Sequence, residues 1–307
     1  MKAAPFDYLR ARSVAEAVAA LGARDGAVAL AGGQSLVPLM AARRVRPQWV
    51  VDLNGLGPIL GRLVVERSRG GPSALRIGAL VRHSDLEHHG AVRELVPLLS
   101  DAASCVGYPA VRNRGTVGGS LAHCHPAAEL PAALTAMGAT AVVQGSRGCR
   151  SVPVAELARG PFVSTLARDE VLTEVTVPLP GDDSGAAKTV PERRTGSAWA
   201  EFSRGRREFP LVGVAAVVSV DPVGRCTGAR AVACGVGPVP MDLAECLGEL
   251  VGAERIDDLL ADELASRLPR CIDPPSDLMG SGRDRTDVTG VVLRRALTVA
   301  WARAVGG

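Results

Sequence analysis

The chain has 307 residues, of which 47% are hydrophobic and 22% are charged. This composition is typical of a soluble globular protein, and the length predicts two or three packing units. The 35 basic and 32 acidic residues leave a net charge of only +3, and the aromatic residues are four Phe, three Trp and two Tyr. So small a charge and so few aromatic rings argue against nucleic acid as a partner.

The cysteines and the apolar segments bear on the compartment. Seven cysteines are dispersed without a C-x-x-C pair, which argues against a disulfide framework and against an iron–sulfur cluster held by this chain. The longest apolar run, 212–220, is far shorter than the about 20 residues that span a membrane, and residues 1–12 lack the apolar core of a signal peptide. We therefore expect a cytoplasmic protein without membrane insertion.

The first 55 residues predict a small β-α-β unit. Ser13 is a candidate N-cap, with Glu16 three residues later, for a helix over 14–21. A buried strand at 27–30, a helix at 36–42 and a strand at 49–53 follow, with two adjacent glycines at the crossover.

Residues 56–180 alternate between strand and helix patterns. We expect a hairpin from 63–66 and 75–78, a helix capped by Ser84, helices at 92–103 and 126–137, and strands at 140–144 and 171–177. The glycine-rich segment 112–125 predicts irregular structure, and His83, His88 and His89 lie in a polar stretch where we expect them to be solvated.

A composition break at 180–196, rich in Gly, Pro, Asp, Ser and Arg, predicts a domain boundary. Beyond it we expect strands at 211–220 and 229–235 and helices at 243–251, 256–268 and 288–304. This order favours an α+β fold, with domains at 1–180 (lobes of about 1–55 and 56–180) and 197–307.

Two glycine loops are the clearest candidates for ligand binding. In 31–35 (AGGQS), paired glycines between a strand and a helix allow successive N–H groups to face one anion, although a plain tight turn needs the same residues. In 112–120 (RNRGTVGGS), a second pair is flanked by hydroxyl side chains and follows two arginines. Two such loops suit a ligand with two phosphates, so a dinucleotide is the obvious candidate.

Other familiar sites are missing or weak. The sequence contains no G-x-G-x-x-G after a strand, no P-loop, no G-x-S-x-G and no H-E-x-x-H, so no catalytic residue is assigned. His123 and His125 would share one face of an extended segment, but a zinc site needs about four ligands, and we expect no metal. Glu129 either accepts hydrogen bonds from a cofactor's hydroxyls or is a carboxylate in the first turn of a helix, and Phe209, at the head of an apolar run, is expected in the core.

The two glycine loops resemble the flavin motifs of a known family. Segments 31–40 (AGGQSLVPLM) and 112–122 (RNRGTVGGSLA), continued by 126–131 (PAAELP), are similar to those of the FAD-binding medium subunits of the xanthine dehydrogenase and carbon monoxide dehydrogenase family. Segments 5–8, 170–178, 209–216 and 291–297 follow in the family's order. The likeness runs along the whole chain.

The resemblance implies a fold and a set of FAD-binding residues. The expected fold is a two-lobed FAD-binding domain of the vanillyl-alcohol-oxidase-like (PCMH) type, followed by a smaller α+β domain with an antiparallel sheet and helices. By resemblance, the loops hold the pyrophosphate and ribityl chain, Glu129 meets the ribityl hydroxyls, and Leu172 and Phe209 lie near the isoalloxazine. The residues expected at FAD are Ala31, Gly32, Gly33, Gln34, Ser35, Leu36, Thr116, Gly118, Gly119, Ser120, His125, Glu129, Leu172 and Phe209.

The resemblance also implies a role in a molybdenum hydroxylase complex. Electrons would reach FAD from an iron–sulfur small subunit, after oxidation of the substrate on a molybdopterin large subunit, and would pass to a small-molecule acceptor. Ser120, Cys124, His125 and Glu201 depart from the family's usual residues. These departures keep open the alternative of a stand-alone flavoenzyme acting on a small organic substrate. A third alternative is a nucleotide-binding or assembly module that kept the fold without redox work.

Overall fold

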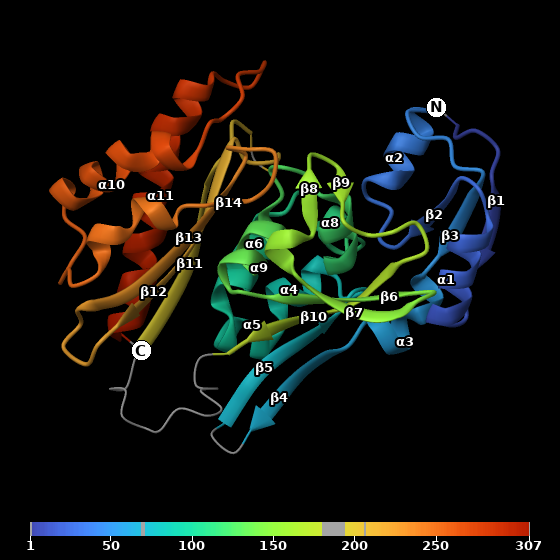
Figure 1. Ribbon diagram of the computed structural model, residues 1–307, viewed down its shortest axis with the longest axis horizontal. Helices are drawn as coiled ribbons and strands as arrows, with labels where there is room; N and C mark the ends of the chain where they lie inside the picture. Colours follow the sequence, from blue (N-terminus) through green and yellow to red (C-terminus); the bar gives the residue numbers. More distant parts are fainter. Residues whose placement is uncertain (1, 69–70, 180–193, 206, 307) are drawn as a thin grey trace.

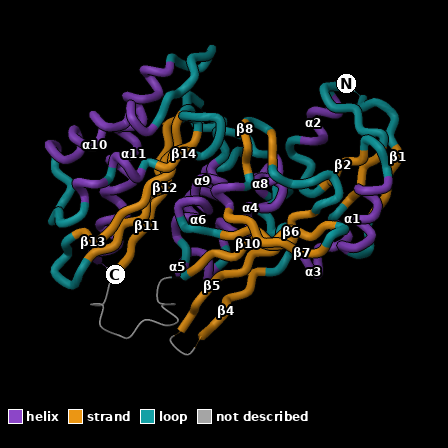
Figure 2. Tube along the Cα trace, in the orientation of Figure 1, coloured by secondary structure: helices purple, strands orange, loops and turns teal. Residues whose placement is uncertain are grey.

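The computed structural model of the chain describes residues 2–68, 71–179, 194–205 and 207–306. Its elements form three units that follow one another along the chain and lie side by side (Figure 1). A small N-terminal unit and a C-terminal sheet with its helices flank a central unit of strands and helices (Figure 2). The two lobes and the C-terminal α+β unit expected from the resemblance are therefore present.

The N-terminal unit is a three-stranded parallel sheet with a covering helix. Its strand order is β1(Asp7–Arg10), β3(Trp49–Asp52), β2(Ala27–Leu30). The helix α1(Val14–Ala23) begins as predicted, because the Ser13 side chain accepts a hydrogen bond from the Glu16 N–H at 3.0 Å. The second helix is α2(Leu36–Ala41). The β-α-β prediction is confirmed, although β1, which is mostly exposed and lacks an apolar pattern, was not predicted.

The central unit is a five-stranded antiparallel sheet covered by helices. Its order is β4(Leu63–Ser68), β5(Gly71–Gly78), β10(Val171–Pro178), β6(Thr140–Gly145), β7(Gly148–Pro153). The helices and short elements are η1(Asn54–Leu56), α3(Gly57–Leu60), α4(His83–His88), α5(Gly90–Leu95), α6(Pro97–Cys105), α7(Pro109–Arg112), α8(Val117–His123), α9(Glu129–Ala136), η2(Val154–Glu156), β8(Ala158–Gly160) and β9(Val163–Ser164).

Three predictions in the central unit are corrected. The single helix expected over 92–103 is two helices, because Pro97 lacks an N–H and starts α6 as a new first turn. The segment expected to be irregular contains α8, which Thr116 caps by accepting a hydrogen bond from the Gly119 N–H. α4 begins at His83, ahead of the predicted cap at Ser84.

The C-terminal unit is a four-stranded antiparallel sheet in the order β11(Arg194–Phe202), β12(Val212–Val220), β13(Cys226–Cys234), β14(Met241–Asp242). One face packs against α11(Gly282–Gly306), which α10(Asp258–Cys271) contacts in turn, and the other face packs against α6 and α9 of the central unit. Ala215, Val232 and Cys234 therefore belong to the central core. This packing places the segment before β12, which contains Phe209, beside the central unit.

Three further expectations for the C-terminal unit are corrected. The helix predicted over 243–251 is two short 3₁₀ turns, η3(Ala244–Cys246) and η4(Gly248–Leu250). Strand β11 begins at Arg194, within the predicted boundary segment, of which 180–193 lies outside the described residues. A disulfide joins Cys246 to Cys271, so one pair of the dispersed cysteines is linked. None of the described helices combines the length and the apolar character needed to cross a bilayer.

Candidate functional site

One cavity collects all of the site residues predicted from the sequence. Its volume is about 520 Å³, and it lies where the N-terminal unit, the central helices and the segment before β12 meet. The predicted residues that line it are Ala31, Gly32, Gly33, Gln34, Ser35, Leu36, Thr116, Gly118, Gly119, Ser120, His125, Glu129, Leu172 and Phe209. This volume falls within the range of about 300–1,000 Å³ that is typical of small-molecule sites.

The first glycine loop connects β2 to α2 and offers a run of amides. Gly33 has a φ of +72°, in the left-handed region that favours glycine, and its carbonyl accepts the Val37 N–H at 3.1 Å to start α2. Within the part of the chain that the structure describes, the backbone N–H groups of residues 32–35 donate to no protein acceptor. Successive amides of this kind form an anion-binding nest. The loop therefore fits a phosphate-bearing ligand.

The second glycine pair lies in the first turn of α8, and its amides are already bonded. The Gly118 N–H donates to the Ala79 carbonyl at 2.9 Å, and the Gly119 N–H donates to Thr116 Oγ1 at 3.1 Å. A Cβ atom on Gly118 would lie 2.7 Å from the Ala79 Cβ. This pair therefore allows close packing of α8 beneath the cavity and supplies fewer amides than the first loop.

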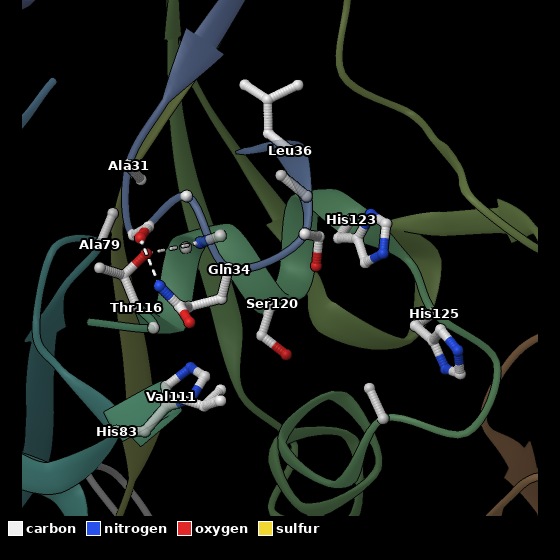
Figure 3. Close-up of a pocket in the computed structure, with 18 of the residues that line it drawn as sticks. Ala31, Gln34, Leu36, Ala79, His83, Val111, Thr116, Ser120, His123 and His125 are labelled. Atoms are coloured by element: carbon white, nitrogen blue, oxygen red, sulfur yellow. Dashed lines mark hydrogen bonds between the residues drawn. The ribbon is translucent and has the colours of Figure 1, made fainter. Parts of the chain in front are cut away.

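The two loops nevertheless meet, as Figure 3 shows around Ala31, Gln34 and Thr116. A Cβ atom on Gly32 would overlap the Arg114 carbonyl oxygen and lie 2.9 Å from the Gly115 Cα. A Cβ atom on Gly119 would lie 4.0 Å from the Ala31 Cβ. The two loops therefore lie side by side, and the absence of a side chain at Gly32 makes this close approach possible.

Glu129 is a buried carboxyl group at the start of α9. Its exposed fraction is 2%, and it lines the cavity. Burial raises the pKa of its carboxyl group to about 8, the nearby Glu201 carboxylate raises that pKa further, and its own backbone N–H opposes the shift. The side chain is therefore protonated at neutral pH and can donate a hydrogen bond as well as accept one.

His125 and Phe209 form a flat pair between two units. Their rings are stacked, with centroids 3.7 Å apart and planes 8° apart, and the Phe162 ring meets His125 edge-on at 5.2 Å. Burial lowers the pKa of His125 to about 4, so its imidazole is neutral, and Nδ1 accepts the Ala127 N–H at 3.1 Å. The remaining proton is on Nε2. Figure 3 shows His125 at the far side of the pocket from His83.

His83 was wrongly expected to be solvated. Its exposed fraction is 6%, it lines the cavity, and neither ring nitrogen has a hydrogen-bond partner of normal geometry among the described residues. Burial lowers the pKa of its imidazole to about 4. The polar stretch after it misled the prediction, because His83 itself faces inward at the first position of α4, against the Gly115 backbone.

The sequence also missed several other lining residues, and no motif signals them. Ala79 and Leu80 follow β5, and Val106, Gly107 and Tyr108 lie between α6 and α7. These apolar positions contribute shape rather than charge. At the edge of the cavity, the Arg207 guanidinium lies over the Tyr108 ring at 5.4 Å.

The residues that depart from the family pattern have distinct environments. Ser120 lines the cavity. Cys124 is buried with a φ of 48°, and its thiol donates to the Leu121 carbonyl at 3.1 Å, so it ends α8. Glu201 accepts the Trp199 Nε1–H at 2.9 Å, and burial raises the pKa of its carboxyl group.

The two histidines around Cys124 do not form part of a metal centre in the described chain. Their ring centroids are 6.2 Å apart, and His123 ends α8 instead of lying on an extended segment. Among the described residues, no group of three His, Cys, Asp or Glu side chains is placed to hold a metal ion.

Family models match most of the chain. Residues 4–180 match the FAD binding domain in molybdopterin dehydrogenase, and residues 197–300 match the CO dehydrogenase flavoprotein C-terminal domain. Over 99% of this chain and 97% of the relative, the sequence is 36% identical to the 6-hydroxypseudooxynicotine dehydrogenase complex subunit alpha of Paenarthrobacter nicotinovorans. It is 32% identical to the carbon monoxide dehydrogenase medium chain of Hydrogenophaga pseudoflava, covering 97% of this chain and 98% of that one.

Solved structures agree with these matches. A chain of carbon monoxide dehydrogenase from Hydrogenophaga pseudoflava superposes with a TM-score of 0.88 at 31% identity, covering 99% of this chain and 100% of that one. A chain of quinoline 2-oxidoreductase from Pseudomonas putida 86 gives the same TM-score, identity and coverage. With the cavity, the amide run and the matches along its whole length, the chain belongs to the FAD-binding subunits of the molybdopterin dehydrogenases of the xanthine dehydrogenase and carbon monoxide dehydrogenase family.

Proposed function

We propose that this chain holds FAD in a molybdenum hydroxylase complex and relays electrons from an iron–sulfur subunit to a small-molecule acceptor. Support comes from relatives that are named as a complex subunit and as medium chains of dehydrogenases. The observation that carries the proposal is the single cavity that joins the first-loop amides, Glu129 and Phe209. Bound FAD supplies the redox chemistry, and the chain supplies binding, orientation and electrostatics.

The first glycine loop is the proposed diphosphate site. The amides of residues 32–35 have no protein acceptor among the described residues, so they can donate to phosphate oxygens without breaking existing bonds. The Gln34 side chain donates to the Gly32 carbonyl at 3.2 Å and fixes the loop from within. The hydroxyls of Thr116 and Ser120, which also line the cavity, are further hydrogen-bond donors.

Glu129 and the His125–Phe209 pair mark the proposed redox end of the cavity. A protonated Glu129 holds a proton at its carboxyl group and can donate a hydrogen bond toward a ribityl hydroxyl or carry that proton. The stacked His125 and Phe209 rings form one wall of this end, where Phe209 is 49% exposed. Leu172, at the start of β10, adds an apolar wall.

We also propose the domain division and the compartment. An FAD-binding domain of 1–180, with lobes of about 1–55 and 56–180, and a C-terminal domain of 197–307 agree with the two family-model ranges. A cytoplasmic location is supported by five free thiols: Cys105, Cys124, Cys149, Cys226 and Cys234. The Cys246–Cys271 disulfide argues the other way.

The test is the cofactor content of the purified chain. We expect a yellow protein that releases FAD on denaturation, and a Gly33→Val variant without FAD, because its φ of +72° strains a branched residue. The matched control is Gly57→Ala, where an added Cβ meets nothing within 4 Å.

A wild-type chain that neither carries nor takes up FAD would contradict the proposal. Co-expression with candidate iron–sulfur and molybdopterin chains tests the complex. Turnover of a small organic substrate by the isolated chain would instead favour a stand-alone flavoenzyme.

A further inference from the structure

A chain of side-chain hydrogen bonds connects the two glycine loops from behind the cavity. The Arg82 guanidinium donates through Nη1 to the Arg114 carbonyl at 2.5 Å, just before Gly115 of the second loop. Through Nη2 it donates to Asn54 Oδ1 at 2.9 Å. The Asn54 amide in turn donates to the Ala31 carbonyl of the first loop at 2.8 Å. Two side chains, those of Arg82 and Asn54, thus link the two loops, and the hydrogen bonds join four different segments of the chain.

The link is anchored at the N-terminal unit. Asp52 at the end of β3 accepts the Asn54 backbone N–H at 2.9 Å and the Tyr8 hydroxyl at 2.6 Å. These bonds fix Asn54 on the turn that follows β3. Neither Arg82 nor Asn54 is among the residues that line the cavity, so any effect on a ligand acts through the loops.

We propose that Arg82 and Asn54 are positioning residues that clamp the two loops at the spacing required by the diphosphate of FAD. This inference rests on the proposed function. Elsewhere the two loops meet mainly where Gly32 packs closely against the Arg114 carbonyl. This is a packing contact, which does not set the orientation of one loop relative to the other as a directed hydrogen bond does. The Arg82 guanidinium binds that same carbonyl and, through Asn54, is connected to the first loop. A planar guanidinium with two directed donors is suited to bridging two acceptors in this way.

The experiment compares FAD binding by the full chain and by Arg82→Lys and Asn54→Asp. Lysine keeps the positive charge and loses the fork. Aspartate keeps an oxygen toward Arg82, loses the donor to Ala31 and places a second carboxylate against that of Asp52. We expect each variant to raise the Kd for FAD about tenfold, the usual scale for a lost hydrogen bond of a charged group. The double variant should bind FAD as tightly as the single variant that has the lower affinity, because the loss of one hydrogen bond already disconnects the two loops.

The matched control is Arg62→Lys. Arg62 is exposed and donates through Nε to the Pro58 carbonyl at 2.6 Å, away from both loops. We expect its Kd to change less than about twofold. Thermal melting of the cofactor-free variants shows whether each one folds.

Binding of two fragments of FAD, measured by competition with FAD, distinguishes a role in positioning the loops from general damage to the fold. ADP contains the diphosphate and riboflavin contains no phosphate, so the clamp variants should weaken ADP as much as FAD and leave riboflavin unchanged. Unchanged FAD and ADP affinities in Arg82→Lys, or an equal loss for riboflavin, would overturn the clamp. Failure of the wild-type chain to bind FAD would instead overturn the proposed function.

Discussion

Replacing Glu129 by Gln removes one ionisable group from the cavity and keeps the size of the side chain. In the folded chain, burial raises the pKa of this carboxyl group from 4.5 to about 8. The unfolded chain therefore loses the proton first, and the contribution of Glu129 to stability is fully present below about pH 4.5 and is lost as pH rises through about 8. At about 1.36 kcal/mol per pH unit, the three and a half units amount to about 5 kcal/mol.

The assay is urea unfolding of the cofactor-free chain at a series of pH values. Relative to wild type, Glu129→Gln should gain stability between about pH 4 and pH 9, up to about 5 kcal/mol, a large part of an ordinary folding free energy. The control is Glu94→Gln, since Glu94 is exposed on α5. Parallel stability profiles for wild type and Glu129→Gln across this pH range would refute the protonated carboxyl group.

Three further predictions concern the second glycine pair, the Cys246–Cys271 disulfide and the His125–Phe209 ring pair. Gly118→Val should lower the melting temperature of the cofactor-free chain sharply, since its Cβ would lie 2.7 Å from the Ala79 Cβ, whereas Gly90→Ala, with open space, should not. Cys271→Ser should cost the C-terminal unit about 3 kcal/mol in urea unfolding, because the lost disulfide spans 25 residues, and added reductant should then have no effect on the variant. Phe209→Ala should raise the pKa of His125 from about 4 toward 6.5 in an NMR titration, because the stacked ring that buries it is gone; an unchanged titration would show that other groups bury it.

Local signals were sufficient for much of the fold. Ser13 and the apolar spacing after it predicted α1, and the short run at 27–30 is β2 with the predicted bounds. Both signals are local in the sequence, namely a cap and a short apolar run, although this run forms a partly exposed strand. The first glycine loop was found for the same reason, because the turn from β2 into α2 requires Gly33.

The failures depend on contacts between distant segments. Strand β11 was missed because Gly196 interrupts its pattern, and the structure explains this glycine: a Cβ there would overlap the Ala300 carbonyl of α11. Helix α8 contains two glycines and forms where Gly118 bonds to Ala79. No local propensity predicts either element.

The sequence predicted which residues form the site better than it predicted what each of them does. The motifs identified the residues of one cavity, but they did not show which glycine pair has amides free to bind a ligand. The Ala79 carbonyl and Thr116 Oγ1 already occupy the amides of the second pair, and only the folded arrangement reveals this. His83 was missed because one buried side chain in a polar stretch has no sequence signature.

The most direct test of this account is amide hydrogen exchange, residue by residue, with and without FAD. The amides of residues 32–35 should exchange rapidly in the free chain and become protected when FAD binds, because the bound diphosphate gives them acceptors. Those of Gly118 and Gly119 should be protected in both states. Unchanged exchange at 32–35, or protection at Gly118 and Gly119 that depends on FAD, would contradict the assignment of the diphosphate to the first loop.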